Sequence, residues 1–119
     1  MALHNDLGKK GEELAVAWMI SKGYAILHRN WRFGQNEVDI IAKKGKFLCF
    51  IEVKARKHSS YGYPEDSVTK QKFKNIQRAA DGFLQKNPNN PWIQYLILSI
   101  TFFDNKETEY FLIEDVYMK

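Results

Sequence analysis

Apolar and polar residues alternate with two different periods along the chain. Residues 6–21 and 65–85 place apolar side chains at the helical period, which predicts two helices. Five shorter runs, either apolar or alternating and bounded by turn residues, predict strands. These runs are residues 24–32, 36–43, 46–55, 92–103 and 109–113. The expected order αβββαββ indicates a mixed α/β or α+β sheet with helices packed on it, and α/β is the fold class we expect.

The first helix carries signals for both of its ends and two unusual glycines. Asn5 or Asp6 can cap its start, and Gly23 can end it. Gly8 and Gly11 each cost the helix about 1 kcal/mol relative to alanine. We expect this cost to be offset by the close approach of another backbone or of a ligand.

The third predicted strand has two different faces. Because side chains alternate along a strand, Glu52 and Lys54 point the same way. Leu48 and Phe50 share that face, which is therefore partly buried. The other face carries only apolar side chains, namely Phe47, Cys49, Ile51 and Val53.

The turn between the second and third strands determines which residues face each other. A two-residue loop that begins with Gly45 suits a type II′ hairpin turn. In that register Asp39 lies opposite Glu52, with Cβ atoms about 4.5–5.5 Å apart. Glu37 then falls opposite Lys54. A three-residue loop would shift the register and break this alignment.

Two facing carboxylates repel each other, which raises one pKa or requires a cation. Mg²⁺ takes one or two carboxylates and keeps waters and substrate phosphate oxygens as its other ligands. Lys54 beside such a metal could orient or deprotonate a water, or offset charge in the transition state. Asp39, Glu52 and Lys54 thus form the set that phosphodiester hydrolysis requires. The ordinary alternative is that Glu37 and Glu52 form surface ion pairs with Lys54.

Glu12 supplies a third carboxylate, from the first helix. At about 100° per residue it falls in the same arc as Ala15, Val16 and Met19, which should face the sheet. An unpaired buried charge is costly, so this carboxylate could reach the metal or its water. The alternative is a glutamate near a helix N-terminus that favours the helix dipole.

Basic residues are concentrated in one part of the sequence. The formal net charge is +4, and residues 54–78 hold seven basic and two acidic side chains, a net charge of +5. The remaining residues sum to −1. Local positive charge suggests a polyanionic partner, because each phosphate contact releases counterions. A solvated basic face is the ordinary alternative.

Lys70, Lys74 and Arg78 recur every four residues along the second helix. Such a stripe can follow a phosphate backbone, and a solvated face is again the alternative. The first turns of this helix can approach the site, and His58 is the histidine expected near substrate. The residues expected to contact nucleic acid are Arg32, Arg56, Lys57, Lys70, Gln71, Lys72, Lys74 and Arg78.

Length and composition narrow the class of protein. A chain of 119 residues fits one domain, residues 1–119. The start has no basic and apolar regions of a secretory signal, and no apolar run approaches the length of about 20 residues that a membrane span needs. We therefore expect a cytoplasmic protein without membrane contact. Cys49 is the only cysteine, which excludes an internal disulfide and a multi-cysteine zinc site.

Several short motifs together resemble a known family. They are Gly8–Ala15, Gly23–Leu27, Arg29–Arg32, Asn36–Ala42, Phe50–Arg56, Gly62–Glu65 and Val68-Thr69. This combination resembles the bacterial YraN-like family of uncharacterised proteins. That family in turn resembles archaeal Holliday-junction resolvases and the wider PD-(D/E)xK nuclease superfamily. The resemblance extends over residues 7–85.

The resemblance implies a restriction-endonuclease-like, resolvase-type fold and a Mg²⁺- or Mn²⁺-dependent endonuclease that acts on DNA, including branched recombination intermediates. It implies Asp39, Glu52 and the backbone carbonyl of Val53 as metal ligands. It also implies Lys54 as the catalytic lysine and Glu12 as the helix carboxylate of the site. A C2 homodimer follows by the same analogy, because a four-way junction needs two symmetric cuts.

Three positions depart from the pattern of the resembled family. Asn36 stands where the family has glycine, Ala55 where it has threonine, and Asn75 where some relatives have tyrosine. None of these is an expected metal ligand, so the departures bear on substrate choice and dimer geometry. Two other readings stay open. One is a nucleic-acid-binding or partner-binding module with a nuclease fold and little catalysis, and the other is an RNA nuclease.

Overall fold

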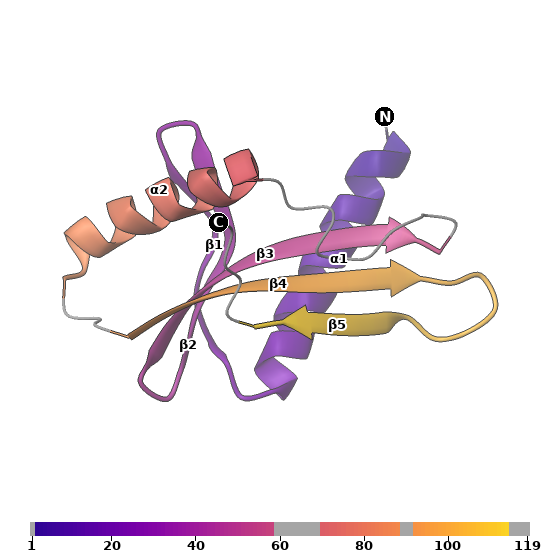
Figure 1. The fold of residues 1–119 in the computed structure, drawn as a ribbon. Helices are drawn as coiled ribbons and strands as arrows, with labels where there is room; N and C mark the ends of the chain where they lie inside the picture. The colour runs from indigo at the N-terminus through magenta and orange to yellow at the C-terminus, as the bar shows by residue number, and fades with distance from the viewer. Residues whose placement is uncertain (1, 59–69, 89–91, 115–119) are drawn as a thin grey trace.

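The structure is a computed structural model that describes residues 2–58, 70–88 and 92–114, with side chains from residue 8 onward. These residues form a mixed α/β fold of two helices and five strands (Figure 1). The elements are α1 (Ala2–Ser21), β1 (Ala25–Phe33), β2 (Asn36–Lys44), β3 (Phe47–Lys57), α2 (Lys70–Lys86), β4 (Trp92–Phe102) and β5 (Glu109–Ile113). The expected mixed α/β class is confirmed.

The strands form one sheet in the order β1-β2-β3-β4-β5. Strand β2 pairs antiparallel with both β1 and β3, and β5 pairs antiparallel with β4. Strands β3 and β4 are parallel. Parallel neighbours require a crossover connection, and α2 lies within that connection. The two helices lie on opposite sides of the sheet (Figure 1).

The hairpin between β2 and β3 has the expected two-residue loop. Lys44 pairs with Phe47, and Gly45 has a φ of 58°, a conformation that glycine adopts without strain. The paired ladder ends at Ile40 and Ile51. The register prediction is therefore confirmed along the hairpin, but Asp39 and Glu52 lie just beyond its last pair. The structure pairs Glu37 with Arg32 of β1 rather than with Lys54.

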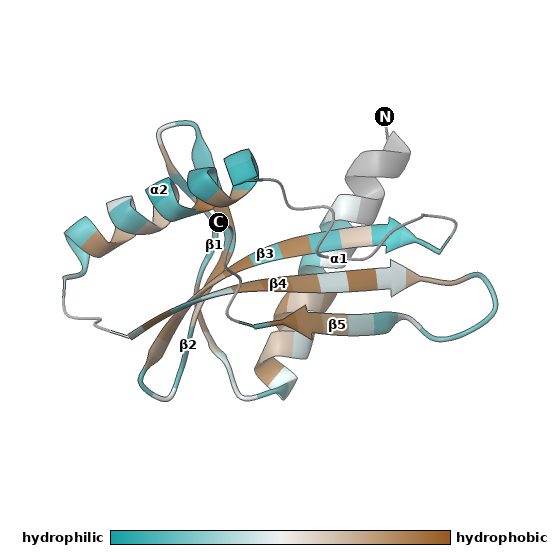
Figure 2. Cartoon of the chain, viewed as in Figure 1, coloured by the Kyte–Doolittle hydropathy of each residue, from teal (hydrophilic) through white to brown (hydrophobic). Residues whose placement is uncertain are grey.

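Each face of the sheet has its own hydrophobic core, and β3 contributes to both. Cys49 and Ile51 pack with Ala15 and Met19 of α1. The other core lies under α2 and consists of Val38, Ile41, Leu48, Phe50, Ile76, Ala79, Ala80 and Phe83. The two predicted faces of β3 are confirmed. Figure 2 shows hydrophobic residues along the middle of β3 and mostly hydrophilic residues with hydrophobic ones between them along α2.

Helix α1 begins earlier than its sequence signals suggest. It starts at Ala2, so Asn5 and Asp6 lie within the helix and do not cap it. The preceding Ala2 and Leu3 are strong helix formers, which accounts for the extension. The predicted end is confirmed, because Gly23 follows the helix with a φ of 95°. Its N–H donates to the carbonyl of Ile20 at 3.0 Å.

The ends of two other predicted segments also differ. Strand β3 continues to Lys57, two residues beyond its predicted end at residue 55. The predicted start of the second helix at residue 65 lies outside the described residues. Within its described part, α2 buries the expected apolar side, including Phe73, Ile76 and Phe83.

Gly11 marks a close contact between α1 and β3. A Cβ atom at this position would lie 2.6 Å from Cβ of Ala55, so the prediction of close backbone approach is confirmed here. At Gly8 a Cβ would meet nothing within 4 Å. The two glycines therefore have different reasons to be present, and only Gly11 lets the helix approach the sheet.

These environments predict opposite effects for the same substitution. We expect Gly11→Ala to destabilise the protein by about 1–3 kcal/mol, because the added methyl group would push α1 away from Ala55 of β3. Gly8→Ala is the matched control and should stabilise it by up to about 1 kcal/mol through helix propensity. Urea unfolding of both variants measures the difference. A stabilised Gly11→Ala protein would contradict the observed packing.

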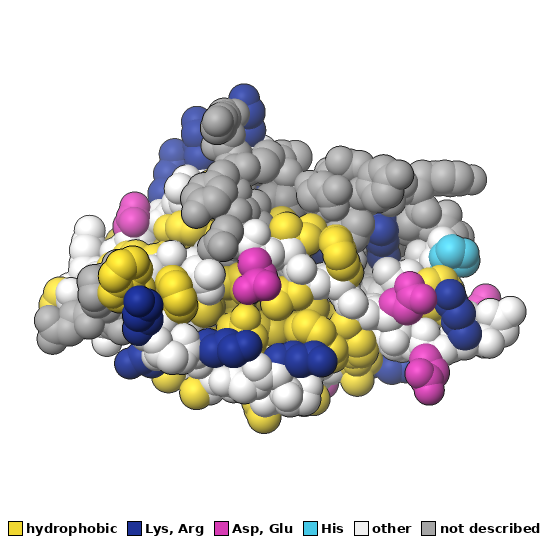
Figure 3. Space-filling view, turned by 60° about the horizontal axis from the view of Figure 1, so that its bottom comes forward, with side chains coloured by type: hydrophobic (Ala, Val, Ile, Leu, Met, Phe, Trp, Pro, Cys, Tyr) yellow, Lys and Arg dark blue, Asp and Glu magenta, His cyan; other side chains and the backbone are white. Residues whose placement is uncertain are grey.

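One face of the molecule combines apolar and basic side chains. Figure 3 shows a broad central hydrophobic patch on this face, with Lys and Arg side chains beside it.

Two tryptophans contact lysines. Trp92 is half exposed, and the Nζ of Lys46 lies 4.4 Å from its ring centre. The Nζ of Lys22 lies 5.2 Å from the Trp18 ring. These tryptophans thus pack with lysines through cation–π contacts. Neither described helix is long and apolar enough to span a membrane.

Candidate active site

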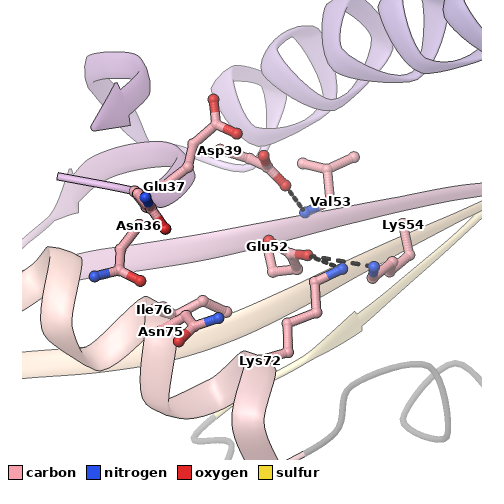
Figure 4. A pocket seen from close by; sticks show the side chains of 10 residues that line it. Asn36, Glu37, Asp39, Glu52, Val53, Lys54, Lys72, Asn75 and Ile76 are labelled. Atoms are coloured by element: carbon pink, nitrogen blue, oxygen red, sulfur yellow. Dashed lines mark hydrogen bonds and ion pairs between the residues drawn. The ribbon is translucent and has the colours of Figure 1, made fainter. Parts of the chain in front are cut away.

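A pocket of about 370 Å³ opens where β2 and β3 meet the first turns of α2 (Figure 4). Strands β2 and β3 contribute charged side chains to it, and α2 contributes one side of its wall. The lining residues are Gln35, Asn36, Glu37, Asp39, Glu52, Val53, Lys54, Lys72, Asn75 and Ile76. The pocket thus brings together Asp39, Glu52, Val53 and Lys54, the residues expected at the centre of the site.

Glu52 is the buried charge of this pocket. Its side chain is 8% exposed, and it lies on the face of β3 that α2 covers. Two ammonium groups contact the same oxygen, Oε2. The Nζ of Lys72 lies 2.8 Å away and the Nζ of Lys54 lies 3.4 Å away (Figure 4). Because an unpaired buried carboxylate is costly, these two ion pairs compensate the burial of Glu52.

Asp39 is held by the neighbouring strand. The backbone N–H of Val53 donates a hydrogen bond to its Oδ2 at 2.8 Å. This bond takes the place of a further ladder bond beyond Ile40 and Ile51 and fixes the carboxylate beside Glu52. Burial and then the charge of Glu52 raise the pKa of Asp39 from 3.8 to about 8, although the bond from Val53 acts in the other direction. The structure thus places two carboxylates side by side with one of them favouring its protonated form.

The two lysines of the pocket differ in their electrostatic surroundings. Burial, followed by the nearby Lys72, lowers the pKa of Lys54. Burial is the largest single influence on Lys72 and disfavours its charged form, but the contacts with Glu52 and Lys54 and the charge of Asp39 together outweigh it and raise the pKa of Lys72. Lys72 is therefore the firmly charged partner of Glu52. Lys54 releases its proton more readily, which suits a residue that exchanges protons with a water or a leaving group.

Glu12 is not among the residues that line this pocket. It is partly buried on α1, as its position in the core-facing arc predicted, and it accepts a hydrogen bond from Nδ2 of Asn30 at 3.5 Å. Helix α1 covers the face of the sheet opposite to α2, whereas Glu52 points to the α2 side. The helical period gave the correct side of α1, but it does not determine which face of the sheet α1 covers.

The predicted basic contacts divide into four groups. Lys70, Lys74 and Arg78 are exposed on α2. Arg32 is exposed and forms an ion pair with Glu37 at the pocket, with 3.6 Å between Nε and Oε2. Lys57 and the partly buried Arg56 lie at the far end of β3. Lys72 alone of the predicted basic contacts lines the central pocket.

Gln71 and His58 contact neighbouring side chains and do not line the pocket. Nε2 of Gln71 donates to Oδ1 of Asn75 at 3.1 Å, one helical turn along α2. The ring of His58 packs on Phe103, with 4.6 Å between ring centres. His58 borders a different pocket, which Lys57 and Phe103 also line. The structure therefore does not bring His58 to the acidic centre.

Sequence reasoning missed two features of the pocket. Asn36 and Asn75 line it, although both were considered only as departures from a family pattern. The pairing of Lys72 with Glu52 was also not expected. A signal for it was present, because Lys72 precedes the core residue Ile76 by one helical turn and so lies on the sheet-facing side of α2.

The donor atoms of the pocket limit what it could bind. Within residues 2–58, 70–88 and 92–114, no group of three or more His, Cys, Asp or Glu side chains is placed to hold a metal ion. Asp39 and Glu52 form a pair of carboxylates instead. Mg²⁺ and its analogues need only one or two protein carboxylates when water and substrate phosphate complete the shell. The two carboxylates of the pocket thus satisfy the protein's share of such a coordination shell.

Comparison with known proteins gives the family of this chain. The chain belongs to Uncharacterised protein family UPF0102, whose model matches residues 11–104. It is 50% identical over 86 residues to a UPF0102 protein of Phocaeicola vulgatus, covering 72% of this chain and 71% of the relative. It is 51% identical over 85 residues to one of Chlorobium phaeobacteroides, covering 71% and 68% of the two chains. The YraN-like part of the sequence resemblance is thereby confirmed.

Proposed function

We propose that this protein is a metal-dependent endonuclease that hydrolyses phosphodiester bonds in DNA, with branched DNA as the preferred class of substrate. The observation that carries the proposal is the pocket in which Asp39, Glu52 and Lys54 meet. Two carboxylates and a lysine on adjacent strands are also what the resemblance to the PD-(D/E)xK nucleases implies. A restriction-endonuclease-like arrangement of the sheet and helices is part of this proposal.

The residues of the pocket fit a hard divalent cation, Mg²⁺ or Mn²⁺. Asp39 and Glu52 would hold it through oxygen atoms, with the backbone carbonyl of Val53 as a third protein ligand. Two observations support this fit. The pKa of Asp39 is raised to about 8 by burial and by Glu52, a penalty that a cation would remove, and Glu52 already attracts a cationic group at 2.8 Å. When bound, such a cation polarises a phosphoryl oxygen and acidifies a water.

The chain's own side chains have separate tasks in this scheme. The hydrogen bond from Val53 keeps the Asp39 carboxylate oriented toward the pocket. Lys54, whose pKa burial lowers, orients the attacking water and accepts or returns its proton. The exposed stripe of Lys70, Lys74 and Arg78 on α2 binds backbone phosphates and positions the strand without reading its sequence.

The wider setting of the proposal rests on the resemblance to resolvases. A four-way junction has two symmetric scissile bonds, so the protein would act on it as a C2 homodimer. A cytoplasmic location is included in the proposal, as is Arg56 with Lys57 as a further phosphate contact at the end of β3. DNA is favoured over RNA by the resemblance alone.

A second candidate function is a nucleic-acid-binding module with little catalysis. The observation in its favour is that Glu52 is satisfied by Lys54 and Lys72 without any metal. A pocket whose buried carboxylate is already neutralised could bind a phosphate backbone through its lysines and cut nothing. The two functions differ in whether a divalent cation enters the pocket.

A cleavage assay over several substrates tests the proposal. Labelled four-way-junction, flap, single-stranded and duplex DNA, with structured RNA beside them, are incubated with Mg²⁺, Mn²⁺ or EDTA. We expect metal-dependent cutting, most efficient on branched DNA, that Glu52→Gln abolishes. Lys9→Ala, on the exposed side of α1, should cut like the wild type.

The alternative functions predict different combinations of cleavage and binding. Binding of branched DNA without any cutting would favour the binding module over the nuclease. Cutting of RNA but not of DNA would leave the chemistry intact and change the substrate class. Neither cutting nor binding would overturn both candidate functions.

A further inference from the structure

Glu52 is approached by lysines from two different elements. Lys54 belongs to the same strand, two residues along β3, whereas Lys72 reaches across from the first turn of α2 (Figure 4). Both ammonium groups lie against the same oxygen, Oε2, and Lys72 is the nearer at 2.8 Å against 3.4 Å. The contact that links α2 to the acidic centre is therefore an ion pair with the most buried carboxylate of the pocket.

This ion pair occupies a carboxylate that the proposed function assigns to a metal ion. A divalent cation on Glu52 would meet the positive charge of Lys72 at short range, where like charges repel strongly in a partly buried site. Asp39 adds to the demand for positive charge, because it lies beside Glu52 and both would be ionised around a cation. The ammonium of Lys72 thus compensates the negative charge of Glu52 in the way that a bound divalent cation would.

Lys72 is also placed to leave. Its side chain is 39% exposed, compared with 24% for Lys54 and 8% for Glu52. A lysine ammonium sits on a flexible stem of four carbons, so it can move toward solvent without displacing α2. Lys70, two residues earlier on the same helix, is exposed. A Lys72 ammonium released from Glu52 would point to solvent beside the pocket that it lines.

We propose that Lys72 is the resident counter-ion of Glu52, which a divalent cation displaces so that its ammonium becomes available to a backbone phosphate. Lys72 is then a positioning residue that links occupancy of the acidic centre to the strength of substrate binding. The inference rests on the proposed function, since it assigns a role to the same pocket. It concerns which group neutralises Glu52 before a metal ion binds, and the proposed hydrolysis does not determine that.

Manganese binding without nucleic acid tests this role directly. Titration calorimetry at pH 7.5 compares wild type, Lys72→Met and Lys70→Met. We expect Lys72→Met to bind Mn²⁺ about tenfold more tightly, because it removes an ammonium that repels the cation at short range. Lys70→Met removes the same charge from a neighbouring exposed position. We expect its affinity for Mn²⁺ to change less than about twofold, because solvent and salt screen a charge at that position.

The outcomes separate this inference from the proposed function. Equal or weaker Mn²⁺ binding by Lys72→Met, with normal binding by the wild type, would overturn the inference and leave the metal site standing. Absence of Mn²⁺ binding by the wild type would overturn both.

A second readout applies whether or not the Lys72→Met protein is fully stable. In EDTA, Lys72→Met should melt at a lower temperature than Lys70→Met, because Glu52 loses its nearer partner. Saturating Mn²⁺ should narrow that difference, because the cation replaces Lys72 on Glu52. The conservative variant Lys72→Arg should restore the melting temperature in EDTA. A difference between the two variants that Mn²⁺ leaves unchanged would show a merely structural ion pair and contradict displacement.

Discussion

Replacing Asp39 with asparagine should stabilise the metal-free protein. The folded chain raises the pKa of this carboxyl from 3.8 to about 8 by burial and by the charge of Glu52. Asparagine resembles the protonated form, keeps an oxygen that can accept the Val53 hydrogen bond, and removes the repulsion. We expect a gain of roughly 2 kcal/mol in the free energy of unfolding at pH 8, a value reduced from the full linkage for partial solvent screening.

The sign of this effect depends on pH. A raised pKa means that the folded protein retains a proton that the unfolded chain has lost. The stability contributed by this proton is complete below pH 3.8 and is lost as the pH rises toward about 8. The advantage of Asp39→Asn over wild type should therefore be small near pH 4 and largest at pH 8. Urea unfolding in EDTA at several pH values measures this trend.

The same variant separates the effects of charge and metal. Mn²⁺ should raise the melting temperature of the wild type but not of Asp39→Asn, because a ligand that binds only the folded state stabilises it. Asp104→Asn, at an exposed position beyond β4, is the control and should show neither the pH-dependent gain nor the loss of the metal effect. Equal Mn²⁺ shifts in Asp39→Asn and wild type would count against Asp39 as a ligand.

Replacing Lys54 with alanine should reduce the cleavage rate far more than substrate binding. General acid–base catalysis by a positioned side chain contributes about 10²–10⁴-fold to a rate, so we expect a loss of this size in single-turnover cleavage. The Lys72 ammonium remains to pair Glu52, with 2.8 Å between Nζ and Oε2, so the pocket should stay folded. The dissociation constant for branched DNA should change only a few-fold, since a single phosphate contact contributes little of the total affinity.

Lys54→Arg distinguishes two ways in which Lys54 could act. Arginine keeps the positive charge but cannot release its proton at ordinary pH. If Lys54 transfers a proton, both Lys54→Ala and Lys54→Arg should lose most of the activity. A Lys54→Arg protein with nearly full activity would assign charge stabilisation to Lys54 instead. Wild-type rates in Lys54→Ala would exclude Lys54 from the reaction.

Local sequence rules predicted the parts of the site that lie on one hairpin. Gly45 fixed the two-residue turn, so the pairing from Lys44 to Ile40 followed from turn chemistry. The alternation along β3 then assigned Glu52 and Lys54 to one face. The end of the ladder was not predictable in this way. It depends on the side chain of Asp39, which takes the N–H of Val53 and ends the regular pairing.

The parts that depend on helix packing were harder to predict. Lys72 meets Glu52 only after the chain has crossed from β3 to α2, and no sequence spacing measures that crossing. The helical period placed Glu12 on the buried side of α1, but the pocket opens on the other face of the sheet. The early start of α1 depends on the helix preference of Ala2 and Leu3. The extension of β3 depends on pairing with β4, where Arg56 pairs with Thr101 and Lys57 with Phe102.

The most direct test of the proposed metal site is an anomalous diffraction measurement on crystals soaked in Mn²⁺. Data collected near the manganese absorption edge locate the ion without assumptions about activity. We expect one strong peak between the carboxylates of Asp39 and Glu52, with the Lys72 ammonium moved away from Oε2. A pocket without a peak, and with Lys72 still bound to Glu52, would contradict the metal site and with it the proposed nuclease.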